Sequence, residues 1–212
     1  MSARRAYGGV SADQRREQRR AALLDAAREI IGTQGFSAMT VIGLCKAAGL
    51  NDRYFAENFD SREALFSALI DQIMTEMAEV ITTATIHTGT ADIPTLTRAA
   101  IAAMIEYLTD DPRRARIALL EAPANPVVAQ RRREVMDFFL GLANQNLVDL
   151  FGPGRTLAAA GRLRFAGVSL FGAMMETITT WLAGGLPMTR DELIDHTADL
   201  TVLLINHVYP TP

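Results

Sequence analysis

Apolar side chains recur at intervals of three and four residues along most of this chain, which is the spacing of one helical face. Over residues 11–33 this spacing predicts an amphipathic helix that ends at Gly32 and Gly35, since glycine favours helix ends. No segment combines strict apolar–polar alternation with many β-branched side chains, as a half-buried strand would. The chain is therefore predicted to be all-α.

Helices with recognisable start signals follow. Thr40 can cap a second helix, Gly49 makes a turn, and Asn51 can cap a third helix that closes near Phe59. The segment 60–63 resembles a capping box and opens a long fourth helix. Further helices are expected over 93–108, 111–123, 126–151, 156–182 and 190–208, separated by breaks rich in glycine or proline.

This order of elements predicts three parts. Residues 1–16 form a flexible basic arm, 17–66 a three-helix domain with a helix-turn-helix motif over 40–59, and 67–212 a larger six-helix domain. With 212 residues, of which 49% are hydrophobic, the chain can bury a substantial core.

Charge is distributed unevenly between these parts. The formal net charge is −3, yet residues 1–62 carry ten Arg or Lys against seven Asp or Glu, and the remainder carries eleven against seventeen. A basic N-terminal part on an acidic body fits a localised contact with a polyanion rather than a general coating by nucleic acid.

Several classes of protein are disfavoured by the composition. The single cysteine, Cys45, permits no intramolecular disulfide or cysteine-based zinc site and indicates a reducing, cytoplasmic compartment. The N-terminus lacks the apolar core of a secretory signal. The apolar segment 165–185 has Glu176 near its middle, so a buried helix is favoured over a membrane span.

Catalytic chemistry has no sequence signature here. His87, His196 and His207 have no helix-spaced carboxylate or cysteine companions that would indicate a metal site. The chain contains no nucleophile elbow and no phosphate-binding loop. We therefore expect no enzyme activity, no catalytic residues, no metal and no cofactor.

The segment 40–59, TVIGLCKAAGLNDRYFAENF, contains the pattern of residues that indicates a binding partner. A helix, a glycine-containing turn and a second helix led by polar side chains is the arrangement that places a helix in the major groove of DNA. Gly49 permits a positive φ at the corner, and Asn51 satisfies free amides at a helix start that also favours phosphate.

Candidate DNA contacts follow from this placement. Arg53 can pair with the edge of guanine or with phosphate, and Tyr54 can hydrogen-bond to the DNA backbone or stack on a sugar. The only lysine, Lys46, and Arg62 suit phosphate. Asp52 and Glu57 repel phosphate unless they accept from a cytosine amine. The predicted set is Thr40, Lys46, Asn51, Asp52, Arg53, Tyr54, Asn58 and Arg62.

The N-terminal arginines leave two interpretations open. They could contact the flank or the minor groove of DNA, or they could belong to a merely solubilising tail. The residues concerned are Arg4, Arg5, Arg15, Arg16, Arg19 and Arg20.

Over roughly Arg19–Phe66 the chain resembles the TetR-type bacterial transcriptional regulators. The resemblance is carried by Gly35-Phe36, Thr40-Val41, Ala48-Gly49-Leu50-Asn51, Phe59 and Ser61-Arg62-Glu63-Ala64-Leu65. It implies a DNA-binding domain followed by an effector and dimerisation domain. Members of this family commonly have small residues where Arg53 and Tyr54 stand, and a tyrosine where this chain has Ala56.

The resemblance also implies an apolar effector cavity in the second domain. Methionine is adaptable and common where a surface accepts varied apolar ligands, although each residue taken singly fits an ordinary bundle core. The candidate lining residues are Met74, Met77, Met104, Tyr107, Glu121, Phe138, Phe139, Phe171, Met174 and Met175. Glu121, Asn144 and Glu176 are candidate polar anchors, since each lies on or beside an apolar helix face.

The last two predicted helices are apolar on more than one side. A monomer would expose Leu200, Leu203, Leu204 and Val208, and an apolar patch of that size usually marks an interface. We therefore expect a homodimer through these two helices.

Together these observations predict a ligand-responsive DNA-binding regulator. It would act as a repressor that binds a near-palindromic double-stranded operator as a dimer and is released by a small apolar effector. The alternative is a helical small-molecule carrier or partner-binding module that retains a degenerate motif, for which Ala56 and the acidic residues of the third helix are the best support.

Overall fold

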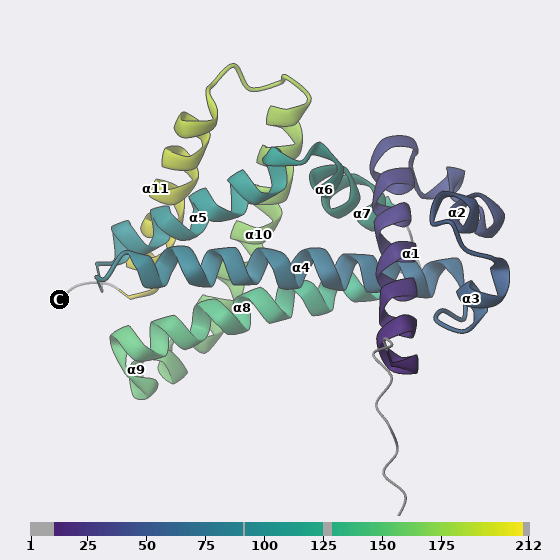
Figure 1. Ribbon diagram of the computed structural model, residues 1–212. Coiled ribbons are helices and arrows are strands. Elements are labelled where there is room, and N and C mark those ends of the chain that lie inside the picture. The colour runs from purple at the N-terminus through teal and green to yellow at the C-terminus, as the bar shows by residue number, and fades with distance from the viewer. Residues whose placement is uncertain (1–10, 91, 125–128, 210–212) are drawn as a thin grey trace, which may run out of the picture. The chain divides into compact units, whose positions relative to one another are not determined.

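The computed structural model describes residues 11–90, 92–124 and 129–209 (Figure 1). Helices fill these ranges, and no strand occurs within them, which confirms the all-α prediction. The chain divides into two compact units, Met1–Leu69 and Ile70–Pro212. Most of the predicted basic arm, up to residue 10, lies outside the described residues, but from Ala12 onward it is helical rather than flexible.

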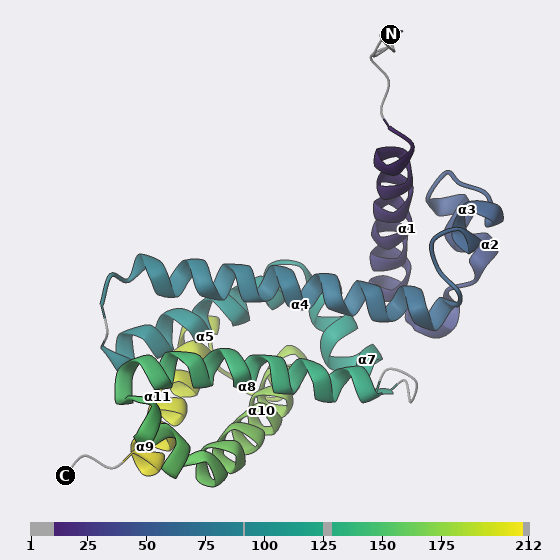
Figure 2. The same ribbon diagram turned by 90° about the horizontal axis from the view of Figure 1, so that it is seen from below.

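The first unit contains α1 (Ala12–Gln34), the short 3₁₀ turn η1 (Phe36–Ala38), α2 (Val41–Ala47), α3 (Asp52–Ala56) and the first residues of α4 (Arg62–His87). Both views show α2 and α3 together beside α1 (Figures 1 and 2). Its core consists of fully buried apolar side chains from each of the longer elements, including Leu23, Ile31, Leu44, Leu65 and Phe66.

Local capping explains where these helices begin. Ser11 and Gln14 form a reciprocal capping box at the start of α1, and the Thr40 hydroxyl accepts from the Gly43 N–H at 3.1 Å. The Ser61 hydroxyl accepts from the Ala64 N–H at 3.0 Å at the start of α4. Side-chain acceptors at these positions satisfy amides that have no partner within the helix.

The second unit contains the rest of α4 and the remaining elements. These are α5 (Ile93–Asp110), α6 (Pro112–Ala115), the π-helical turn η2 (Arg116–Glu121), α7 (Ala122–Ala124), α8 (Ala129–Phe151), α9 (Pro153–Ala158), α10 (Ala160–Leu182) and α11 (Arg190–Val208). Helices α5 and α11 lie side by side in both views (Figures 1 and 2).

Two ion pairs join the first part of α11 to α5. Arg98 pairs with Asp195, and Arg190 pairs with Asp110, each at 2.7 Å. At the chain's C-terminal end the Tyr209 ring stacks on Phe151 with centroids 4.3 Å apart. These contacts attach α11 to the rest of the unit through both polar and aromatic groups.

The sixth predicted helix, over 111–123, is not continuous. It begins at α6, where the Asp111 carboxylate caps the helix and pairs with Arg113 at 2.8 Å. It then widens into η2, and Arg116 pairs with Glu121, five residues on, at 3.3 Å. A π-helical turn places residues five apart near one another, so this ion pair fits the observed register.

Two other boundaries differ from the prediction. The helix predicted over 156–182 is divided between two helices, α9 and α10, which are separated at Ala159, with φ −94° and ψ −1°. The third helix ends at Ala56 rather than near Phe59. Pro126, the predicted start of the next helix, lies outside the described residues.

Candidate functional site

The start of α3 presents exposed polar groups, as its sequence suggests. Gly49 adopts φ +67° at the corner after α2, a conformation that disfavours other residues. The Asn51 side chain accepts from the Tyr54 N–H at 3.2 Å and caps α3. Asn51, Asp52 and Arg53 are exposed on the turn that follows.

The other predicted contact residues in this unit differ in their exposure to solvent. Thr40 and Lys46 are exposed at opposite ends of α2. Asn58 is half-buried, and its amide nitrogen donates to the Tyr54 backbone oxygen at 2.7 Å. The Tyr54 ring is also half-buried, with the Arg19 guanidinium 4.5 Å from its centroid.

Arg62 makes contacts within the first unit. Its Nη1 donates to the backbone oxygen of Met39 at 2.7 Å, and its guanidinium lies 5.3 Å from the centroid of the Phe36 ring. Glu63 is 4.0 Å away. A phosphate contact by Arg62, as predicted from the sequence, would have to compete with these groups.

Glu57 is a functional candidate that the list of predicted contacts omits. Its Oε1 accepts from the Arg53 Nε at 2.9 Å, and its Oε2 lies 3.9 Å from Nη2 of Arg19. Its backbone oxygen accepts from Nη2 of Arg16 at 3.0 Å. The last two arginines lie on α1, so only the tertiary structure reveals that they converge on Glu57.

Arg16 and Arg19 therefore have contacts that a solubilising tail would not make. Arg20 likewise lies 4.5 Å from the centroid of the Phe59 ring. Arg4 and Arg5 lie outside the described residues. Another feature missed from the sequence is Ile42 on α2, which is 81% exposed although it is apolar.

The second unit contains a large apolar cavity. Its volume is about 890 Å³, within the range of about 300–1,000 Å³ that is typical of ligand pockets. Side chains from α4, α5, η2, α8, α10 and α11 line it. The predicted residues among them are Met74, Met77, Met104, Phe139, Phe171, Met174 and Met175.

Three predicted lining residues lie elsewhere. Phe138 is 53% exposed, because neighbouring residues of a helix point about 100° apart and Phe139 takes the inward direction. Tyr107 is buried, but its hydroxyl donates to Glu76 Oε2 at 2.6 Å, and Glu121 pairs with Arg116.

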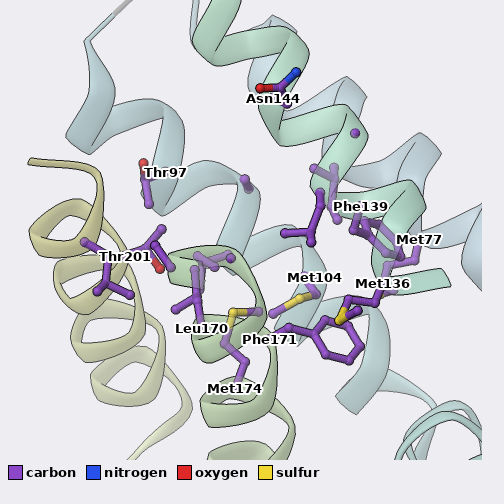
Figure 3. A pocket seen from close by; sticks show the side chains of 18 of the residues that line it. Met77, Thr97, Met104, Met136, Phe139, Asn144, Leu170, Phe171, Met174 and Thr201 are labelled. Atoms are coloured by element: carbon purple, nitrogen blue, oxygen red, sulfur yellow. The ribbon is translucent and has the colours of Figure 1, made fainter. Parts of the chain in front are cut away.

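Most side chains that line the cavity are apolar, and the polar ones include Thr97, Asn144 and Thr201. Figure 3 shows these three residues around the cavity, together with Met104 and Met136. Asn144 is thus the one candidate polar anchor that lines the cavity. Glu176 is exposed on α10, and Glu121 is engaged in η2.

A charged pair also lines the cavity. Arg164 on α10 and Asp137 on α8 are 3.1 Å apart, with side chains 65% and 53% exposed. Because they combine exposure to solvent with a place in the lining, they mark an edge of the cavity that water reaches.

Large apolar side chains remain exposed on α10 and α11. Phe165 and Val168 on α10 fall three residues apart, and Leu200 and Leu203 on α11 do the same, so each pair lies on one helical face. Leu204 is half-buried and lines the cavity, and Val208 is buried. Of the predicted interface residues, Leu200 and Leu203 are thus the exposed ones.

Two negative findings concern the described part of the chain. No group of three or more His, Cys, Asp or Glu residues in it could hold a metal ion. None of its helices has the length and apolar character needed to cross a membrane.

The N-terminal part of the chain is similar to a family of known proteins. The sequence pattern of the bacterial regulatory proteins of the tetR family matches residues 23–69. The matched segment contains α2, Gly49 and α3, so it includes the helix-turn-helix described above.

Solved tetR-like structures extend the likeness of fold beyond that segment. The fatty acid degradation regulator FadR of Bacillus halodurans superposes with a TM-score of 0.71 at 20% identity, covering 86% of this chain and 94% of its own. FadR of Bacillus subtilis, solved in complex with stearoyl-CoA, superposes with a TM-score of 0.71 at 22% identity, covering 86% of this chain and 97% of its own.

A TetR-like transcriptional regulator from Rhodococcus sp. RHA1 gives a TM-score of 0.62 at 16% identity, covering 91% of this chain and 97% of its own. At these identities the likeness concerns the fold. A comparison with curated proteins gives no match.

Proposed function

We propose that this chain is a tetR-family transcription regulator, and that it acts as a homodimeric repressor that leaves its operator when an apolar effector enters the cavity of the second unit. The observation that carries the proposal is the capped, exposed start of α3 within the segment matched to the family. Exposed polar side chains at the start of a helix suit both base edges and phosphates.

DNA contact is assigned to the exposed groups of α2 and α3. Thr40, Lys46 and Asn51 suit phosphate, and Asp52 and Arg53 suit base edges. Two such heads in a dimer would enter successive major grooves, with half-sites about 34–36 Å apart along a near-palindromic operator.

The effector is proposed to be a long apolar chain with a polar or anionic head. The cavity supports this class by its size, its methionine-rich lining and the polar groups Asn144 and Arg164. The Bacillus subtilis FadR was solved with stearoyl-CoA, which belongs to the same chemical class. An anionic head could replace Asp137 beside Arg164, where an anion already finds a partner.

Coupling between effector and DNA is assigned to α4. This helix starts with Arg62 in the first unit and lines the cavity with Met74 and Met77. A ligand that binds preferentially to one placement of α4 would increase the population of molecules with that placement. The dimer would leave the DNA if the distance between its two DNA-binding heads then no longer matched the spacing of the half-sites.

Dimerisation is assigned to the exposed faces of α10 and α11. A stable interface needs about 800 Å² from each partner, and Phe165, Val168, Leu200 and Leu203 would supply its apolar centre. Leu203→Asp should therefore give a monomer in light scattering. Leu120→Asp, which changes another exposed leucine of this unit, should leave a dimer. A monomeric parent protein would contradict the assignment.

The central experiment selects duplex DNA and then adds the effector. The full-length protein should enrich duplexes with two related half-sites from fragments of its own genome. Affinity for them should fall steeply as salt rises, because phosphate contacts release counterions. Stearoyl-CoA or a free long-chain fatty acid should then release the DNA.

The alternative carrier function predicts different results. A carrier would bind the same apolar ligands but enrich no duplex, even at low salt. Native mass spectrometry of the purified protein should identify a retained ligand in either case, so DNA enrichment separates the two functions. Absence of any enriched duplex would overturn the regulator proposal.

A further inference from the structure

The pairing of Arg53 with Glu57 on α3 has a geometry that bears on how bases would be read. Glu57 Oε1 accepts from Nε of Arg53 at 2.9 Å. That bond leaves the two terminal nitrogens, Nη1 and Nη2, on a side chain that is 82% exposed. A guanidinium held at Nε presents its two terminal nitrogens as a fixed fork.

Glu57 is itself held from the side of α1. Arg16 donates to its backbone oxygen at 3.0 Å, and Arg19 lies 3.9 Å from its second carboxylate oxygen. The Arg19 guanidinium also lies 4.5 Å from the centroid of the Tyr54 ring on α3, the helix that Glu57 caps. Glu57 is thus held at its carboxylate by Arg19 and at its backbone by Arg16, 38 and 41 residues away in sequence, which limits its movement.

Helix stability does not explain this pair. Glu57 is the C-terminal cap of α3, where a negative charge is disfavoured by the helix dipole. An arginine four residues before a glutamate is also the less favourable order for a helical ion pair. The position of Glu57 therefore calls for an explanation other than the stability of α3.

We infer that Glu57 is a positioning residue that aims Arg53 at a guanine in each operator half-site. This inference rests on the proposed DNA-binding function and adds the base that is read. Guanine alone presents two adjacent acceptors, N7 and O6, in the major groove, and they match the fork of Nη1 and Nη2.

The same pair argues against phosphate as the partner of Arg53. A carboxylate 2.9 Å from the guanidinium offsets its charge and repels a phosphate, which is negative. A guanine edge is neutral and accepts hydrogen bonds without that repulsion. The pair thus lowers the affinity of Arg53 for DNA of any sequence and increases its discrimination between bases.

The test measures base preference in wild-type and variant proteins. Duplexes are first selected with the wild-type protein, and each base pair of one half-site is then replaced in turn while binding is followed by fluorescence anisotropy. One guanine should stand out, with a loss of about 5- to 150-fold on its replacement. Exchange of that guanine for 7-deazaguanine, which lacks the N7 acceptor, should also weaken binding.

The variants separate positioning from simple repulsion. Arg53→Ala should remove the preference for that guanine, and Glu57→Ala should reduce it strongly. Glu57→Gln should keep most of the preference, since its amide oxygen can still accept from Nε, while affinity for all duplexes rises. If Glu57 only repelled DNA, Glu57→Ala and Glu57→Gln would raise affinity equally and leave the preference unchanged, which would overturn the inference.

Two controls complete the design. Asp195→Asn removes one carboxylate from another exposed arginine pair, Arg98–Asp195, and should leave the base preference unchanged. Circular dichroism checks that each variant is folded. If selected duplexes bind but Arg53→Ala keeps the same preference, the inference fails and the proposed function stands; if the wild-type protein enriches no duplex, both fail.

Discussion

Replacing Arg62 by alanine should destabilise the first unit by about 2 kcal/mol. Its Nη1 bond to Met39 spans only 2.7 Å, and a hydrogen bond to a charged group contributes about 1.5–3 kcal/mol. Because the side chain is 38% exposed, the hydrogen bond should contribute about 1.5 kcal/mol, the lower end of that range. The contact with the Phe36 ring should contribute about 0.5 kcal/mol more. The fully buried Met39 would then keep a backbone oxygen without its partner.

Hydrogen exchange followed by mass spectrometry can measure this effect locally. A loss of about 2 kcal/mol should lower the protection of amides in η1 and α2 by about 30-fold. Peptides from α11, in the second unit, serve as an internal reference. Arg62→Lys keeps the charge but loses the planar fork, so its protection should fall between the wild-type and alanine proteins.

A different outcome would restore the interpretation made from sequence. If Arg62 mainly contacts phosphate, Arg62→Ala would leave exchange unchanged and lower the salt dependence of DNA binding by about one unit of slope. Arg62→Lys would then recover that slope. Unchanged protection in the alanine variant is thus the result that refutes the structural role.

Three further predictions concern single side chains. The pKa of Asp111 lies below its ordinary 3.8, chiefly through a hydrogen bond from a neighbouring arginine, so its stabilisation is complete above that value and is lost as the pH falls through the lowered pKa. In urea unfolding, Asp111→Asn should cost about 1 kcal/mol at pH 7 and nothing in strong acid, and an equal cost at both would contradict this. Burial raises the pKa of the Cys45 thiol, which is 3% exposed, so iodoacetamide at neutral pH should react only after urea unfolds the protein. Gly141→Ala, whose new methyl group meets open space within α8, should raise the free energy of urea unfolding by about 0.5–1 kcal/mol, whereas Gly167→Ala within α10 should gain less, because its methyl group must displace the end of the Leu140 side chain.

Signals that act over a few residues explain why much of the fold could be predicted. The caps at Thr40 and Asn51 and the corner at Gly49 depend on side chains and backbone groups within three residues of each other. The predicted helix over 190–208 coincides with α11 for the same reason, since Thr189 and Glu192 form a reciprocal capping box at its start.

Features that depend on tertiary contacts could not be predicted in this way. The rotation of α8 decides that Phe139 rather than Phe138 meets the cavity, and helical spacing alone does not set that rotation. The convergence of Arg16 and Arg19 on Glu57 requires α1 to pack beside α3. Sequence reasoning therefore found the exposed start of α3 and treated Glu57 as a repulsive charge, without its contact with Arg53.

The π-helical turn η2 also gives one wall of the cavity an unusual tolerance. Leu119 is 7% exposed and lines the cavity, and the next residue, Leu120, is 51% exposed. A π turn holds one more residue than the α turn it replaces, so loss of one residue before Leu119 would let the segment close into a regular helix. The residues on either side of the turn would then keep their places. The wall would keep its apolar surface through a one-residue deletion, which in a regular α-helix would rotate all the residues that follow by about 100°.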